Sequence, residues 1–164
     1  MAKLKKMLGD LNSPQCAALS RKMESMEQET LAKWAVAYAK ERYLPITLSH
    51  YTGTETYLDE AISACELYFD RRMPLAKAKP YLTWARQQAA MLEQPDRLAA
   101  ANAVVSACFA ILTVDSALGA FFYGAAAVAY SEVGLEESDE TYNAIAEREF
   151  EAALRALEAL ETAE

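Results

Sequence analysis

Between Arg97 and Glu132 the chain carries a single charged side chain, that of Asp115. One helix over these 34 residues would be about 51 Å long, whereas the apolar core of a bilayer is about 30 Å thick. The half on each side of Asp115 is slightly short for a membrane span, and a carboxylate at the bilayer centre costs about 2.5–3.5 kcal/mol. We therefore expect no membrane partner, but two buried helices of a soluble core, over about 96–112 and 115–131.

Asp115 is the one polar residue of this run that needs an explanation, because a carboxylate among apolar residues is usually paired, capping a helix or shifted in pKa. Either Thr113 or Asp115 would cap the second helix. The alternatives are a buried ion pair of Asp115 with Arg42 or Arg86, or a contact with a ligand. We expect Arg42 and Asp115 to be structural polar residues.

The run is rich in alanine and glycine, and small side chains let neighbouring helices approach closely. We expect Gly119 and Gly124 to lie at the tightest of these contacts. Gly134 then closes the second helix, since glycine adopts the left-handed conformation that often follows a helix end.

The remainder of the sequence predicts further helices. Ser13 suits the N-cap of a short helix and Pro14 its first position. Pro45 ends the next helix, because the residue before a proline avoids the α region, and a connector with a turn at Gly53 follows over 46–56. Pro80 predicts either a kink or a fresh start within a later helix. Besides the apolar pair, the predicted helices cover 13–24, 26–44, about 55–71, 74–92 and 139–162.

These elements predict an all-α fold of about six to eight helices, either a compact bundle or a short array of helix pairs, around the central Ala/Gly-rich buried pair. The 164 residues fit one domain. Residues 1–12 would form a flexible or loosely attached arm, and 132–164 an acidic turn followed by an amphipathic helix. The apolar stripe of that helix comprises Tyr142, Ile145, Ala146, Phe150, Ala153, Leu157 and Leu160.

The net charge of −8 is concentrated near the C-terminal end of the sequence. Residues 1–131 hold 14 basic and 13 acidic side chains, a net charge of +1, whereas residues 132–164 hold 2 basic and 11 acidic ones, a net charge of −9. Such a segment repels nucleic acids and membrane surfaces and attracts a basic protein. The candidate partner-binding residues are therefore the acidic ones of the turn: Glu136, Glu137, Asp139 and Glu140.

The sequence contains little material for catalysis. His50 is the only histidine, lies in an expected loop and has no metal-ligand partner at a suitable spacing. Cys16, Cys65 and Cys108 are widely spaced without a CxxC pair, so we expect three buried free thiols, as in the reducing cytoplasm. Phosphate-loop, hydrolase and metalloprotease motifs are absent from the sequence. We expect no catalytic residue, no cofactor and no metal, and hence a protein that is not an enzyme.

One part of the sequence resembles a known family. The first strong helix contains Trp34-Ala35, then Glu41-Arg42, then Leu44-Pro45, and the apolar run contains Asp115, Ala117-Leu118-Gly119 and Tyr123. This order of motifs is similar to that of a family of all-α immunity proteins from bacterial polymorphic toxin systems. The resemblance spans roughly residues 25–131, leaving the acidic segment unmatched.

The resemblance implies an inhibitor that binds a cognate toxin domain and blocks its active site or substrate path, without a cofactor. The acidic segment adds that this toxin could be basic, as a nuclease is. Two other functions stay open. One is a scaffold or homo-oligomer in which the last helix docks on a second copy. The other is a small-molecule-binding bundle that uses the aromatic residues Tyr38, Trp84, Phe121, Phe122 and Tyr123.

Overall fold

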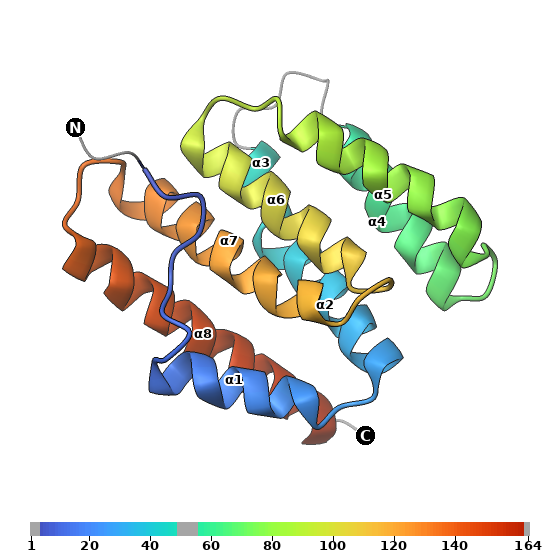
Figure 1. Cartoon of the computed structure of the whole chain (residues 1–164), viewed down its shortest axis with the longest axis horizontal. Coiled ribbons are helices and arrows are strands. Elements are labelled where there is room, and N and C mark those ends of the chain that lie inside the picture. The colour runs from blue at the N-terminus through green and yellow to red at the C-terminus, as the bar shows by residue number, and fades with distance from the viewer. Residues whose placement is uncertain (1–3, 49–55, 163–164) are drawn as a thin grey trace.

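The computed structural model describes residues 4–48 and 56–162, and within these ranges the chain forms eight α-helices and no strand (Figure 1). The all-α prediction and the predicted number of helices are confirmed. The helices are α1 (Pro14–Glu24), α2 (Gln28–Arg42), α3 (Leu44–Leu48), α4 (Thr56–Phe69), α5 (Leu75–Ala89), α6 (Pro95–Phe109), α7 (Asp115–Val133) and α8 (Asp139–Thr162).

The helices α6 and α7 form the centre of the fold and correspond to the predicted buried pair. They share the most extensive helix–helix contact in the described structure, and more than half of the buried residues of each are alanines. None of the helices in the described ranges is long and apolar enough to cross a membrane. The apolar run is therefore the core, and its small side chains allow the close packing that protein interiors require.

Other helices pack on both sides of this central pair. The pair α4–α5 lies against α6, whereas α8 lies against α7 and carries α1 on its other side (Figure 1). The helices α2 and α3 cross α6 and α7 and so connect the two sides. The apolar stripe predicted for α8 is buried by α7 and α1 of the same chain, apart from the partly buried Leu160. This stripe is therefore not available for docking on a second copy.

The two glycines of α7 differ in their surroundings. A Cβ at Gly124 would lie 2.6 Å from the Tyr43 hydroxyl oxygen, closer than real Cβ atoms approach any neighbour. The prediction for Gly124 is thus confirmed. The prediction for Gly119 is wrong, because a Cβ there would meet no atom within 4 Å. Gly134 ends α7 as predicted, with a φ of 82°.

The segment of residues 4–12 packs firmly against the helices, which contradicts the loosely attached arm expected from the sequence. Leu8 is buried, and its backbone N–H donates to the Phe122 carbonyl of α7 at 3.0 Å. The Tyr130 hydroxyl donates to the Lys5 carbonyl. At Gly9, with a φ of 120°, the backbone passes so close to the Phe150 ring that a Cβ would lie 2.5 Å from it. These contacts fix the segment across α7 and α8.

Of the three prolines that we used as markers, Pro14 behaves as predicted, Pro45 does not, and Pro80 excludes one of its two predicted alternatives. Ser13 caps α1 through its Oγ, which accepts from the Cys16 N–H at 3.1 Å, and Pro14 begins the helix as expected. Pro45 does not start a connector but lies in the first turn of α3, where a missing N–H costs nothing. The helix α5 runs through Pro80, so a fresh start there is wrong. Gly53 and His50 lie outside the described residues.

Candidate partner-binding surface

The turn between α7 and α8 presents the four predicted partner-binding acids. Glu136 and Glu137 lie in the turn itself, while Asp139 and Glu140 begin α8, and all four side chains are exposed. Carboxylates in the first turn of a helix are stabilised by the positive end of the helix dipole. Because this segment also faces solvent, it gives the fold a concentrated negative surface, which we call the acidic turn.

Ser138 and Tyr142 hold the acidic turn in one conformation. The Ser138 Oγ accepts from the Thr141 N–H at 3.2 Å and thereby caps α8. The buried Tyr142 hydroxyl donates to the Gly134 carbonyl at 2.9 Å and accepts from the Glu137 N–H at 3.2 Å. These bonds connect the ends of the turn, so its carboxylates are displayed by an ordered backbone.

Two apolar side chains accompany the acids. Val133 at the end of α7 is 36% exposed, and Leu135 in the turn is 43% exposed. Nearby, Arg148 of α8 forms an ion pair with Glu132 of α7 at 2.7 Å. Exposed apolar side chains beside charged ones are typical of a small protein-binding surface. In such a surface the apolar side chains supply affinity and the charges supply specificity.

A second polar feature joins α2 to α8. The carboxylate of Glu149 is completely buried and pairs with Arg42, whose Nε lies 2.8 Å from Oε2 and whose Nη2 contacts Oε1. The Tyr43 hydroxyl donates to Oε2 at 3.5 Å. Arg42 is therefore a polar link between helices, but its partner is Glu149 and not Asp115.

This buried pair changes the acid–base properties of its neighbours. The hydrogen bond to Glu149 raises the pKa of Arg42 above its already high value. Burial, and then the charge of Glu149, raises the pKa of Tyr38 to about 12 and that of Tyr43 well above its usual value. All three groups thus keep one protonation state at neutral pH.

Residues of the Trp-Ala and Glu-Arg motifs converge on one side of this link. Trp34, Glu41 and Arg42 line a cleft of about 440 Å³ together with Ala37, Tyr38 and Ala156. The rings of Trp34 and Tyr38 lie 5.2 Å apart, and each lies 5.5 Å from the Phe121 ring of α7. The motif therefore builds the contact of α2 with α7 and α8.

Asp115 is neither a helix cap nor a member of a buried ion pair. It is exposed in the first turn of α7, the N-cap is Val114, and no side chain makes a capping hydrogen bond there. The predictions of a cap by Thr113 or Asp115 and of a buried ion pair with Arg42 or Arg86 are wrong. Arg86 instead lies over the Phe109 ring, 4.7 Å from its centroid.

The aromatic residues considered for a small-molecule site do not form one group. Tyr38 and Phe121 pack together, whereas Phe122 packs on Phe150 with ring centroids 5.2 Å apart. Trp84 lies on α5 against Tyr57 at 6.2 Å. The set is thus divided between separate packing contacts.

The cysteines and the metal-binding residue types were the remaining candidates for a reactive or metal site. The cysteines Cys16, Cys65 and Cys108 are free and buried, as predicted. Among the residues that the structure describes, no group of three or more His, Cys, Asp or Glu side chains could hold a metal ion.

Sequence reasoning missed Glu149. It lies three and four residues after Ala146 and Ile145, so helical spacing places it inside the apolar stripe of α8. That spacing could have predicted the burial of Glu149. The many other glutamates of α8 instead suggested that Glu149 faces solvent.

Comparison with known proteins identifies the family of this all-α chain. A family model described as "Imm-5 like putative immunity protein" matches residues 21–156, which include α2 to α7 and most of α8. No curated protein and no solved structure matches the chain. The match extends beyond the motifs of α2 and α7 into the acidic turn. The chain belongs to the Imm-5-like family of immunity proteins.

Proposed function

We propose that this immunity protein binds a cognate bacterial toxin domain in the cytoplasm and neutralises it by covering its active site or substrate path. The observation that carries the proposal is the family match over residues 21–156. A steric inhibitor of this kind needs no catalytic residue, cofactor or metal. The toxin is thus the partner, within a polymorphic toxin system.

The acidic turn is the surface that we assign to the toxin. Its four exposed carboxylates belong to a segment with a net charge of −9. A surface of this sign attracts a basic protein over distances of about one Debye length and orients it before contact. A nuclease fits this requirement, since enzymes that act on nucleic acids carry basic surfaces.

The same surface has the order and the apolar contacts that affinity requires. The hydrogen bonds of Tyr142 fix the backbone before the partner arrives, which lowers the entropy cost of binding. Val133 and Leu135 supply apolar area that a partner would remove from water.

The first experiment is co-expression with the product of the neighbouring gene, scored by rescue from toxicity and by co-purification. Rescue with a stable complex is the expected result. If the purified protein neither binds nor protects against a toxic neighbour, the proposed function is wrong.

A second experiment tests the surface. A variant with four neutralised acids is expected to associate with the toxin about tenfold more slowly at low salt, and to lose most of its salt dependence. The four substitutions are Glu136→Gln, Glu137→Gln, Asp139→Asn and Glu140→Gln.

A matched control removes the same charge elsewhere. Four exposed acids outside the acidic turn are replaced, by Glu24→Gln, Asp59→Asn, Glu60→Gln and Glu93→Gln. Equal slowing in both variants would indicate that net charge, and not this surface, governs association. No slowing in the first variant would remove the acidic turn from the interface.

A further inference from the structure

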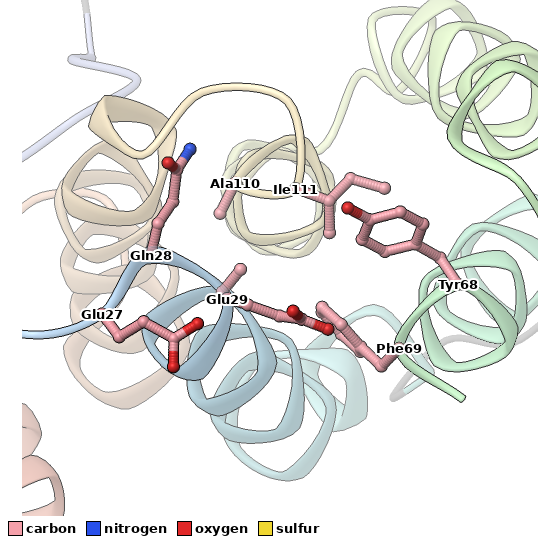
Figure 2. Close-up of a pocket in the computed structure, with 8 residues that line it drawn as sticks. Glu27, Gln28, Glu29, Tyr68, Phe69, Ala110 and Ile111 are labelled. Carbon is pink, nitrogen blue, oxygen red and sulfur yellow. The ribbon is translucent and has the colours of Figure 1, made fainter. Parts of the chain in front are cut away.

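A cleft on another side of the molecule has features of a cation site. It has a volume of about 300 Å³ and lies where α2 begins and where α4 and α6 end (Figure 2). Its lining comprises Glu27, Gln28, Glu29, Ala32, Tyr68, Phe69, Ala110 and Ile111.

The polar groups of this cleft are predominantly negative or electron-rich. Glu27 is exposed, and its carboxylate accepts from the Thr30 hydroxyl at 2.9 Å. The Glu29 carboxylate extends toward the Phe69 ring (Figure 2). The carboxyl ends of α4 and α6 also reach the cleft, and the negative ends of two helix dipoles outnumber the single positive end of α2.

Aromatic and apolar surfaces complete the lining. The rings of Tyr68 and Phe69 are half-buried, with centroids 5.8 Å apart and an interplanar angle of 59°. Ala32 and Ile111, which line the same cleft, are buried. Aromatic faces attract cations through their quadrupole, and apolar side chains receive the alkyl stem that carries such a cation.

One cation of the chain already borders the cleft, but it is held loosely. The Arg71 Nη2 lies 3.8 Å from the Glu29 Oε2, and the Arg71 side chain is 84% exposed. An ion pair of this length in solvent contributes little, so it does not prevent another cation from pairing with Glu29.

We propose that this cleft binds an alkyl-guanidinium or alkyl-ammonium group, with Glu29 as the anion and the Tyr68 and Phe69 rings as the cation–π partners. The group comes either from a Lys or Arg side chain of the bound toxin, which rests on the proposed function, or from a free small amine. The site is separate from the acidic turn, because its residues belong to α2, α4 and the end of α6.

The direct test is a titration of the full chain with arginine amide, followed by amide chemical shifts. Saturable shifts at residues of the cleft are expected, with none from citrulline amide, which has the same shape without the charge. Glu29→Gln should weaken binding about tenfold, as expected for one lost charge-assisted contact. Glu60→Gln, which removes an exposed acid of α4 outside the cleft, should leave it unchanged.

Arg71→Gly provides a change in the opposite direction. Removing the neighbouring cation should strengthen the binding of arginine amide, because Arg71 then no longer competes for Glu29. An absence of saturable shifts, or equal shifts from citrulline amide, would overturn the proposal whatever the toxin experiments show.

The two sources are separated with the toxin complex. If a toxin side chain occupies the cleft, Glu29→Gln raises the dissociation rate of the complex and arginine amide competes with the toxin. If the ligand is a free amine, Glu29→Gln loses arginine amide binding but leaves the toxin complex unchanged.

Discussion

Replacing Arg42 with methionine removes the cation that faces the buried carboxylate of Glu149. Breaking a buried ion pair by deleting one partner costs about 3–5 kcal/mol, because the remaining charge has lost its compensation. The Arg42 side chain is 39% exposed, so water reaches the pair and we expect the lower end of this range, about 3 kcal/mol. For a chain of this size the melting temperature should fall by about 6–12 °C.

The assay is urea and thermal unfolding followed by circular dichroism, with an exposed ion pair as the control. Lys40 pairs with Glu66 at 3.0 Å, but both side chains are about half exposed. Lys40→Met should therefore cost no more than about 1 kcal/mol. The comparison separates the effect of burial from that of losing a lysine or arginine charge.

The double variant Arg42→Met/Glu149→Met completes the test. Two apolar side chains in place of the pair remove the unpaired charge, so stability should return close to that of the parent chain or exceed it. A single variant as mild as Lys40→Met, or a double variant as unstable as the single one, would refute the reasoning.

Three further predictions follow from the packing and the protonation states. Gly124→Ala should destabilise the fold by about 1–3 kcal/mol through overpacking. Gly119→Ala should instead stabilise it by up to about 1 kcal/mol, since the added methyl group meets open space. Chemical denaturation of both variants measures the difference in their free energies of unfolding. Tyr142→Phe should cost about 1 kcal/mol and speed amide hydrogen exchange in the acidic turn, because two hydrogen bonds disappear. The pKa values of Cys108 and Tyr38 are raised in the folded state, so the folded protein keeps protons that the unfolded chain releases. The free energy of unfolding should therefore fall from about pH 9 towards pH 12. Urea titrations at a series of pH values measure this change.

Local sequence rules located the helices well, because caps and breakers act over a few residues. Ser13, Pro14 and Gly134 each mark a helix end in the structure as they did in the sequence. The same rules misjudged Pro45, because a proline that ends one helix also suits the first turn of another.

The polar residues show where sequence reasoning stops. Asp115 lies in the most apolar run of the sequence but is exposed. It is the first residue of α7, and this end of the helix reaches the surface. Glu149 lies in the most acidic helix and is buried, because its partner Arg42 comes from a helix 107 residues earlier. Pairing across that distance depends on tertiary packing, which no local pattern encodes.

The packing of α1 on α8 has a consequence for the order in which the chain matures during synthesis. The apolar face of α1, with Cys16, Leu19 and Met23, makes its most extensive helix contact with α8, which begins at position 139. At about 5–20 residues per second, a ribosome needs roughly 6–23 s to make the intervening stretch. Until then α1 lacks its main packing partner, and an isolated helix of 11 residues is only marginally stable in water, so α1 becomes a stable part of the fold only after α8 has been made.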